Sequence, residues 1–262
     1  MKIIALLTDF GLSDNFVGVM KGVIYRINPE AKIVDLCHQI ESHNIHQAAF
    51  LLKKSYPYFS EGTVFVVVVD PGVGGERKPI IVKTEKYLFV APDNGVLSFL
   101  VERDIKKIIH ITNEEYFLKP VSRTFHGRDI FAAVAAHLSE GERIENFGPA
   151  IKDMERIELP EPGVEKNRLL GEIIYVDRFG NLITNINRDV FLQFIERKKF
   201  RIVIGETRIS KISSSYQEGK EGSPIAIFDS FDNLEISLYR SDASRSLNLN
   251  KGSKIYIEKS NT

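Results

Sequence analysis

The most apolar stretch of the chain, TVFVVVVD, occupies residues 63–70. Every position from Val64 to Val69 is apolar, a pattern typical of a strand that is buried on both faces of a parallel sheet. The turn-forming sequence DPGVGGERKP follows at residues 70–79. We therefore expect this strand to lie inside an α/β domain, with a loop at its carboxyl end.

Helical and extended patterns alternate on either side of this strand. Before it, apolar residues recur at the spacing of amphipathic helices in residues 14–28 and 44–56. The expected strands are residues 2–8, 32–37, 63–70, 79–84 and 86–92, and two further helices are expected at residues 94–103 and 128–141, the last with Gly141 as its C-cap. Residues 1–155 are thus predicted to form an N-terminal α/β domain with a largely parallel central sheet.

A change of pattern near residue 159 indicates a second domain. The sequence LPEPGVEKN, which begins at Leu159, places two prolines and a glycine among charged residues, so we assign residues 156–168 to a linker. Short extended segments separated by turn residues then predict a smaller, β-barrel-like C-terminal domain over residues 169–262. Its expected strands are residues 169–177, 201–210, 223–230, 234–240 and 253–259, with a helix at residues 188–197.

The composition limits the kinds of partner. Lys and Arg total 35, as do Asp and Glu, so no basic surface is expected that would bind nucleic acid or a membrane. The single cysteine, Cys37, excludes an internal disulfide, and no apolar run reaches the roughly eighteen residues of a membrane span. The short apolar start ends at Asp9, where a signal peptide would need small residues. We expect a soluble, cytoplasmic protein that acts on a small molecule.

Polar residues follow the first expected strand. In TDFGLSDNF, Thr8 and Asp9 end the strand and Asp14 precedes a helix. Open α/β sheets bind ligands beyond the carboxyl ends of their strands, where an acidic side chain can accept hydrogen bonds from a ribose diol. Asp9 is the candidate for that role. The alternative is a turn in which Ser13 or Asp14 caps the helix.

Two further motifs combine charge with glycine. VVVVDPGVGGER places Asp70 at the end of the apolar strand and Arg77 after a glycine-rich turn, without the spacing of a phosphate-binding loop. RTFHGRDIF places His126 and Gly127 at the start of a helix, whose amino terminus disfavours an imidazolium, although Asp129 opposes this effect. The alternatives are a plain strand-ending turn and a packing histidine.

Other polar groups are weaker candidates. Asp93 and Asn94 in APDNGVLS follow another strand, so that Asp93 joins the carboxylates at strand ends. In YVDRFGNLITN, Asp177, Phe179 and Asn181 offer two polar groups and a ring, or form an ordinary turn. The histidines of CHQIESHNIHQ lack the spacing of metal ligands, so no metal site is expected.

Taken together, these motifs resemble the adenosine-forming S-adenosylmethionine (SAM) hydrolases, also called SAM hydroxide adenosyltransferases, which are relatives of fluorinase and chlorinase. TDFGLSDNFVGVMKG, DPGVGGER, APDNGVL, TFHGRDIFA and VDRFGNLITN occur in the family's order and cover essentially the whole chain. The resemblance implies hydrolysis of SAM to adenosine and methionine by attack of water or hydroxide on the ribose C5' carbon, with no cofactor. It also implies a homotrimer with sites between subunits.

The resemblance assigns roles to individual residues. Asp70, Arg77 and His126 match the family's Asp-Arg-His set, which activates the water, and Asp9 matches the ribose ligand. The remaining substrate contacts that it implies are Thr8, Asp14, Phe125, Gly127, Asp177, Phe179, Asn181, Ser230 and Ala243. At residues 239–247, YRSDASRSL replaces the family's more usual asparagine- and alanine-rich stretch, where Arg240, Asp242 and Ala243 would contact adenine.

Three other functions remain open at this point. A halogenase would transfer the adenosyl group to chloride or fluoride, but the halogenating relatives carry Tyr and Ser at positions resembling Asp70 and Gly127, which favours water. A metal-dependent phosphoesterase would use Asp9, Asp70, Asp93 and His126 as ligands. A non-catalytic SAM or adenosine sensor would bind its ligand and leave it intact.

Overall fold

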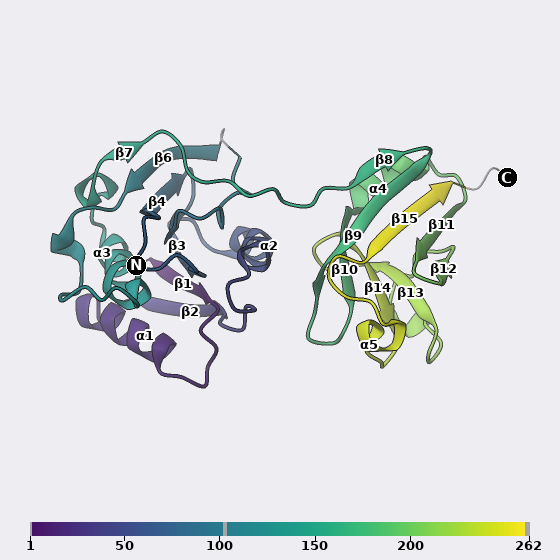
Figure 1. Cartoon of the computed structure of the whole chain (residues 1–262), viewed down its shortest axis with the longest axis horizontal. Coiled ribbons are helices and arrows are strands. Elements are labelled where there is room, and N and C mark those ends of the chain that lie inside the picture. The colour runs from purple at the N-terminus through teal and green to yellow at the C-terminus, as the bar shows by residue number, and fades with distance from the viewer. Residues whose placement is uncertain (1, 102–103, 260–262) are drawn as a thin grey trace. The chain divides into compact units, whose positions relative to one another are not determined.

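A computed structural model describes residues 2–101 and 104–259 of the chain. The chain divides into two compact units, Met1–Leu159 and Pro160–Thr262, which we call unit 1 and unit 2 (Figure 1). Unit 1 combines a central sheet with helices, and unit 2 is dominated by strands.

Unit 1 is built on a sheet whose described strands follow the order β2-β1-β3-β5-β4-β6-β7. Strands β2, β1, β3 and β5 pair in parallel, whereas β4, β6 and β7 pair antiparallel to their neighbours. The strands are β1 Ile3–Thr8, β2 Lys32–Cys37, β3 Val64–Val68, β4 Pro79–Thr84, β5 Leu88–Pro92, β6 Ile105–His110 and β7 Ala150–Ile151. The predicted α/β class with a largely parallel sheet is confirmed.

Helices cover both faces of this sheet. The helices are α1 Phe16–Ile27, α2 Ile45–Ser55 and α3 Ala133–Glu140, with short helical turns at η1 Tyr56–Tyr58, η3 Glu114–Tyr116, the π-helical η4 Gly127–Ala132 and η5 Ile144–Phe147. Alternate residues of β3 enter two apolar cores: Val66 lies with α1 and α3, and Val67 lies with α2. The unbroken apolar run of β3 therefore reflects burial on both faces, as predicted.

The helix expected at residues 94–103 is wrong where the structure describes it. Residues 94–100 form turns, and residues 102–103 lie outside the described residues. The side chain of Asn94 accepts a hydrogen bond from the backbone N–H of Val96, and Gly95 has a φ of +90°. This turn stabilised by the Asn94 side chain competes with a helix that the apolar spacing alone would favour.

The helix predicted at residues 128–141 is confirmed, but its first turn is wider than an α-helix. η4 covers Gly127–Ala132 and continues directly into α3. Gly141 has a φ of +107° and ends α3 as a left-handed C-cap, as predicted. The wide turn lies at His126, a predicted site residue, and such turns are frequent at functional sites.

Unit 2 is a barrel-like antiparallel sheet, which confirms the predicted class. Its described strands follow the order β12-β11-β15-β9-β10-β14-β13, with β8 also paired to β9. They are β8 Gly163–Glu165, β9 Arg168–Val176, β10 Leu182–Asn187, β11 Phe200–Ile204, β12 Thr207–Ile209, β13 Pro224–Phe228, β14 Asn233–Leu238 and β15 Lys254–Lys259. The helices are α4 Arg188–Ile195 and α5 Ala243–Leu247, with a short helical turn at η6 Tyr216–Glu218. One apolar core that includes Leu169, Ile236 and Ile257 fills this unit.

Unit 2 also departs from its expected strands. The segment expected as one strand at residues 201–210 forms the hairpin of β11 and β12, because Gly205 takes a φ of +54° between them.

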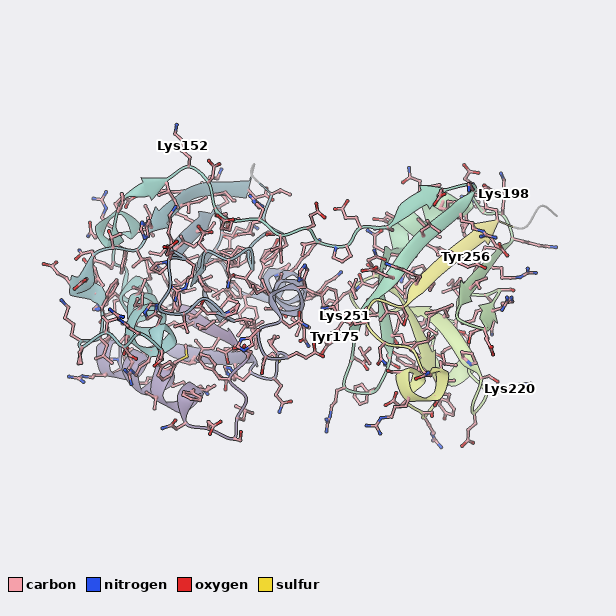
Figure 2. The ribbon with its side chains drawn as sticks, viewed as in Figure 1. Lys152, Tyr175, Lys198, Lys220, Lys251 and Tyr256 are labelled. Carbon is pink, nitrogen blue, oxygen red and sulfur yellow. The ribbon has the colours of Figure 1, made fainter. Side chains whose placement is uncertain are left out.

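Charged side chains such as Lys152, Lys198 and Lys220 extend from the surfaces of their own units (Figure 2). Among the helices of the described chain, none is long and apolar enough to cross a bilayer.

Candidate active site

The candidate residues of unit 1 gather at the carboxyl end of its parallel strands. β1 and β3 pair with Thr8 opposite Val68, so Asp9 and Asp70 leave the sheet at the same edge. Open α/β sheets bind their ligands at this edge. Both carboxylate side chains are nearly covered, since Asp9 is 8% exposed and Asp70 is 4% exposed.

Asp70, Arg77 and His126 form one bonded group. Nε of Arg77 donates to Oδ1 and Oδ2 of Asp70 at 3.0 and 2.9 Å, and its Nη2 also donates to Oδ2. The same Nη2 lies 2.7 Å from Nδ1 of His126. Because a guanidinium can only donate, Nδ1 of His126 is the acceptor and the proton of the neutral ring is on Nε2.

A glycine lets the loop at residues 70–77 reach His126. Gly74 has a φ of +74°, and a Cβ atom there would lie 2.1 Å from the carbonyl oxygen of Arg123. The loop therefore packs backbone against backbone on the segment that leads into His126. A larger residue at Gly74 would push this loop, and Arg77 with it, away from the imidazole.

His126 is held in its neutral form. Burial, followed by the positive charge of Arg77, lowers the pKa of the imidazole below its ordinary value, while nearby carboxylates oppose the shift. One of these is Asp129, whose buried carboxylate binds Arg128 and the backbone N–H of Ser122. Neutrality was expected from the helix amino terminus, but burial and Arg77 are the causes that the structure identifies.

Asp9 and Thr8 are ordered by histidines from neighbouring segments. Oδ2 of Asp9 accepts a hydrogen bond of 2.9 Å from the backbone N–H of His43, while its Oδ1 has no hydrogen-bond partner among the described residues. Oγ1 of Thr8 lies 2.9 Å from Nδ1 of the buried His38, and Nε2 of that ring lies 3.0 Å from Asp35. Asp9 is thus fixed in place with one oxygen available to a ligand.

Aromatic rings lie beside these polar groups. The rings of Phe10, Phe16 and Phe125 contact one another with centroids 5.2 to 5.8 Å apart. A Cβ atom at Gly127 would lie 3.3 Å from the rings of Phe10 and Phe125, so glycine admits this cluster.

Asp14 is exposed just before α1, and the N-cap of that helix is Asn15 rather than Asp14. Phe10 and Phe16 were missed from the sequence, although both lie within TDFGLSDNF.

The carboxylate of Asp93 is bound by a backbone N–H group. Its carboxylate, which is buried, accepts a hydrogen bond of 2.7 Å from the N–H of Glu155, and burial raises the pKa of this carboxyl. A metal site built from Asp9, Asp70, Asp93 and His126 is not formed in the described part of the chain, where no three metal-ligating side chains cluster.

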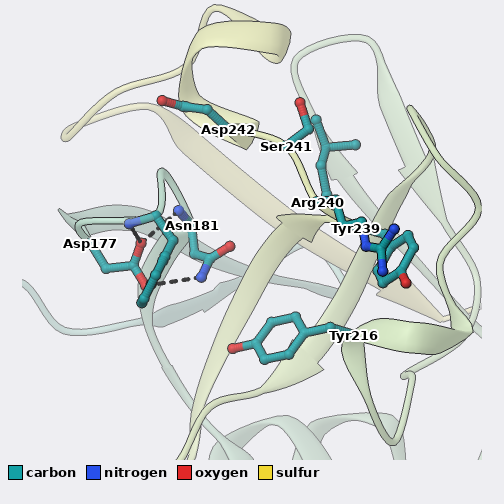
Figure 3. A pocket seen from close by; sticks show the side chains of 9 residues that line it. Asp177, Asn181, Tyr216, Tyr239, Arg240, Ser241 and Asp242 are labelled. Atoms are coloured by element: carbon teal, nitrogen blue, oxygen red, sulfur yellow. Dashed lines mark hydrogen bonds between the residues drawn. The ribbon is translucent and has the colours of Figure 1, made fainter.

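A pocket lies in unit 2. This pocket has a volume of about 650 Å³ and is lined by Asp177, Phe179, Asn181, Tyr216, Leu238, Tyr239, Arg240, Ser241 and Asp242 (Figure 3). Oδ1 of Asp177 accepts hydrogen bonds of 2.8 Å from the backbone N–H groups of Phe179 and Asn181, and Oδ2 accepts one of 2.9 Å from Nδ2 of Asn181. The carboxylate thus shapes the turn between β9 and β10, and the Phe179 residue at its tip is 77% exposed.

A buried carboxyl lies behind this pocket. Glu235 is 3% exposed, and its Oε1 accepts hydrogen bonds from the hydroxyls of Tyr216, at 3.0 Å, and Ser237. Burial raises the pKa of Glu235, and burial together with this carboxyl raises the pKa of Tyr216. Because the Tyr216 proton is committed to Glu235, its oxygen can act toward a pocket ligand only as an acceptor. Sequence patterns did not reveal this pair, whose members lie 19 residues apart in different elements.

The turn of Asp177 has a counterpart elsewhere in unit 2. The pattern Asp-x-Phe-x-Asn occurs at residues 177–181 and again at residues 229–233. In the second turn, Asp229 accepts from the N–H groups of Phe231 and Asn233 at 2.8 and 2.9 Å and from the Asn233 side chain at 3.1 Å. The residue before the asparagine has a positive φ in both turns, +84° at Gly180 and +60° at Asp232. The same short sequence pattern therefore folds the same way twice.

The remaining candidates of unit 2 lie in different places. Ala243 is buried at the start of α5, next to the pocket residue Asp242, which caps that helix. Ser230 is exposed in the second of the two similar turns and does not line the pocket.

Comparisons with known proteins assign the chain to one family. The family model of the SAM hydroxide adenosyltransferase N-terminal domain matches residues 4–148, and that of the C-terminal domain matches residues 171–256. The chain belongs to the SAM hydroxide adenosyltransferase family. Four of the motifs that carry the sequence resemblance lie in the first match and VDRFGNLITN lies in the second, so the resemblance is confirmed.

Individual relatives of this SAM hydroxide adenosyltransferase family member agree. The chain is 39% identical to the (R)-S-adenosyl-L-methionine hydrolase of Methanocaldococcus jannaschii, over 98% of this chain and 96% of that protein. A solved structure described as an uncharacterized conserved protein from Thermotoga maritima matches with a TM-score of 0.91 and 40% identity, over 98% of this chain and 100% of that one. A fluorinase from Nocardia brasiliensis is 28% identical over 71% of each chain.

Proposed function

We propose that this protein hydrolyses S-adenosyl-L-methionine to adenosine and L-methionine, by in-line attack of water or hydroxide on the ribose C5' carbon. The observation that carries the proposal is the bonded group of Asp70, Arg77 and His126 at the ligand-binding edge of unit 1. The named activity of the Methanocaldococcus jannaschii relative, which matches over nearly the full length of both chains, supports it.

The chemistry of the substrate suits a site with no strong acid. Because the sulfur of SAM is a sulfonium, methionine leaves as a neutral thioether and its departure needs no proton. The reaction therefore needs a nucleophile in line with the C5'–S bond, and holding it there supplies much of the rate. Carboxylates such as Asp9 and Asp70 also favour binding of the positive sulfur.

Arg77 lowers the barrier but cannot supply free hydroxide. A positive charge about 4 Å away stabilises hydroxide by roughly 4 kcal/mol at an effective dielectric constant of about 20, which is about three pKa units. Water has a pKa of about 15.7, so about six units remain at neutral pH. Proton removal must therefore accompany the attack on carbon.

We assign the role of proton acceptor to Asp70. Nδ1 of His126 accepts from Arg77, and the other ring nitrogen bears the proton, so neither nitrogen of the neutral ring serves as a base. Oδ1 of Asp70 accepts one hydrogen bond, from Nε of Arg77, and so keeps a lone pair for the water. His126 then acts by fixing the guanidinium of Arg77.

Substrate binding in this proposal uses unit 1 of one subunit and unit 2 of a neighbouring subunit. Oδ1 of Asp9 accepts from the ribose diol, next to the other unit 1 contacts Thr8, Asp14, Phe125 and Gly127. The contacts in unit 2 are Asp177, Phe179, Asn181, Ser230 and Ala243. The proposal includes a homotrimer located in the cytoplasm and a reaction without a metal or an organic cofactor. Analytical ultracentrifugation tests the trimer.

The first experiment incubates the pure protein with SAM and EDTA and follows the products by chromatography. We expect adenosine and methionine, with the oxygen of ¹⁸O-labelled water in the 5'-hydroxyl of adenosine. Intact SAM after prolonged incubation, or unlabelled adenosine, would overturn the proposal. Loss of activity in EDTA would indicate metal chemistry instead.

The fluorinase similarity calls for a halide arm in the same experiment. Chloride or fluoride is added at high concentration, and the products are examined for a 5'-halo nucleoside. We expect none above background, because a halide has no proton to donate to the carboxylate of Asp70 and is repelled by its negative charge, whereas water donates a hydrogen bond to it. A halo nucleoside as the main product would reassign the protein to adenosyl transfer onto halide.

A further inference from the structure

The turn after β5 joins the two ends of the loop that carries the Asp70–Arg77 pair. The backbone N–H of Asp93 donates to the carbonyl oxygen of Lys78 at 2.8 Å. Nδ2 of Asn94 donates to the carbonyl oxygen of Val69 at 2.9 Å. Val69 directly precedes Asp70 and Lys78 directly follows Arg77. Two consecutive residues therefore hold the backbone on both sides of the reacting loop.

The carboxamide of Asn94 has one orientation. Its Oδ1 accepts a hydrogen bond of 3.2 Å from the N–H of Val96, while its Nδ2 binds Val69. Neither a carboxylate nor an aliphatic side chain can make both bonds, because one end must donate and the other must accept. The two hydrogen-bond partners of Asn94, and not a contact with the substrate, therefore require an asparagine at this position.

The turn at Asp93 and Asn94 is also held by residues 155–157, which lie near the end of unit 1 in the sequence. Glu155 N–H binds the carboxylate of Asp93 at 2.7 Å, and Ile157 N–H binds the hydroxyl of Ser98 at 2.8 Å. A Cβ atom at Gly95 would lie 2.5 Å from the Ile157 side chain. These contacts, all within unit 1, give the Asp93–Asn94 turn a rigid support.

We propose that Asn94 is a positioning residue for the hydrolysis, which acts by fixing the carbonyl of Val69 and so the direction in which Asp70 presents its carboxylate. The inference rests on the proposed function. Asn94 touches neither Asp70 nor Arg77 through its side chain in the hydrogen bonds above; its effect passes through one backbone group.

The test replaces Asn94 with aspartate, which keeps the acceptor toward Val96 and turns the donor toward Val69 into a carboxylate oxygen. At pH 8 we expect kcat to fall about tenfold or more, because small displacements of a catalytic group are costly, with KM changed by less than about twofold. As the pH is lowered, the introduced carboxyl takes up a proton and can donate to Val69 again. The ratio of wild-type to variant kcat should then shrink.

Asn113 provides a matched control. Its Nδ2 donates to the carbonyl oxygen of Asn146 at 2.9 Å, and its Oδ1 accepts from the N–H of Glu115 at 3.1 Å. Asn113→Asp thus makes the same chemical change at the same kind of backbone bridge, outside the candidate site. We expect it to leave kcat unchanged. Equal losses of kcat in the two variants, or a wild-type kcat in Asn94→Asp, would overturn the positioning role.

A readout that does not depend on turnover separates this inference from the proposed function. The NMR signal of the Arg77 Nε–H group should shift in Asn94→Asp and stay in place in Asn113→Asp. A shift in a protein that releases no adenosine would overturn the proposed function but show that Asn94 still positions Arg77. The absence of a shift would overturn the positioning role alone. If Asn94→Asp does not fold, Asn94→Ser, which keeps a turn-forming oxygen but lacks the amide donor, is measured in its place. The same fall in kcat and the same shift of the Arg77 signal are expected, without the recovery at low pH, because a hydroxyl does not titrate in that range.

Discussion

Asp70 in unit 1 and Asp177 in unit 2 are both carboxylates with three hydrogen bonds, but their donors differ in kind. Asp70 is bound by the charged guanidinium of Arg77, which also contacts His126. Asp177 is bound by two backbone N–H groups and the amide of Asn181. In the proposed reaction, the first arrangement places a charge pair where a water loses its proton. The second uses the carboxylate to hold a turn in shape.

From this difference in donors we expect that Asp70 acts in the reaction and that Asp177 maintains the shape of its turn. The carboxylates bound within their own turns give the same structure at residues 177–181 and 229–233. The carboxylate of Asp70 is bound by Arg77, whose guanidinium is also held by His126 from a distant segment, so this arrangement depends on the packing of unit 1. Substitutions at Asp70 should therefore change turnover, whereas those at Asp177 should change stability and substrate affinity.

The largest effect is expected for Asp70→Asn. The amide cannot take up the proton of water and also places a donor against Arg77, so we expect kcat to fall about a hundredfold or more with a much smaller change in the affinity for SAM. Steady-state release of adenosine and equilibrium binding of SAM measure the two quantities. Asp229→Asn is the control, since its turn lies outside the pocket, and it should keep the wild-type kcat. Equal losses of kcat and SAM affinity in Asp70→Asn would contradict a role of Asp70 in turnover alone.

The next effect is an acid limb in the pH profile. The lowered pKa of His126 lies below its ordinary value of about 6.5, so the ring is neutral at pH 7 and kcat should fall about tenfold per pH unit below its pKa as protonation ends the bond from Arg77. At a pH between the lowered pKa of His126 in the folded protein and its ordinary value in the unfolded chain, the unfolded chain binds more protons than the folded one. The free energy of unfolding therefore also falls as the pH drops through that window. An unchanged kcat down to pH 4 would contradict this role of His126.

A smaller effect is expected for Asp177→Ala. The change leaves two backbone N–H groups without their acceptor, which costs about 1–3 kcal/mol of the free energy of unfolding and should raise KM about tenfold by reshaping the pocket. Asp229→Ala removes the same bonds from the other turn, which lies outside the pocket and carries the proposed contact Ser230. It should lower the melting temperature similarly in calorimetry but raise KM less than Asp177→Ala does. An equal rise of KM in the two variants would mean that the two turns do not differ in function.

The smallest effect is expected for Phe179→Ala. Phe179 is 77% exposed, so removal of its ring should change the free energy of unfolding by less than about 0.5 kcal/mol. Contact with the substrate would be lost, however, and KM should rise about fivefold, since an aromatic contact contributes roughly 1 kcal/mol. Phe231→Ala in the second turn should leave KM as it is. Calorimetry and adenosine release on the two variants would decide whether Phe179 contacts the substrate.

The fold was predictable where local pattern and burial agree. The unbroken apolar run of β3 correctly predicted a strand with two buried faces, and Gly141 correctly predicted the end of α3. The helix expected at residues 94–103 was wrong because the Asn94 side chain binds the backbone of its own turn, an effect that apolar periodicity does not register.

The candidate site was predictable only as a set of motifs. Strand ends correctly suggested that Asp9 and Asp70 share an edge, but the distance from Arg77 to His126 depends on how Gly74 packs against a segment about fifty residues away in sequence. Tyr216 and Glu235 could not be paired in advance, because hydrogen bonds between distant segments leave no periodic pattern in the sequence.

The Asn94 turn also bears on how long the protein survives chemically. Asn94 is followed by Gly95, a dipeptide in which the glycine nitrogen can attack the carboxamide with little steric hindrance, expelling ammonia and leaving aspartate after hydrolysis. In the folded chain the carboxamide is tied at both ends, which restrains the rotation that this attack requires. Unfolding during heating would remove this restraint and allow deamidation to produce the Asn94→Asp change, so mass spectrometry should monitor heated preparations beside activity.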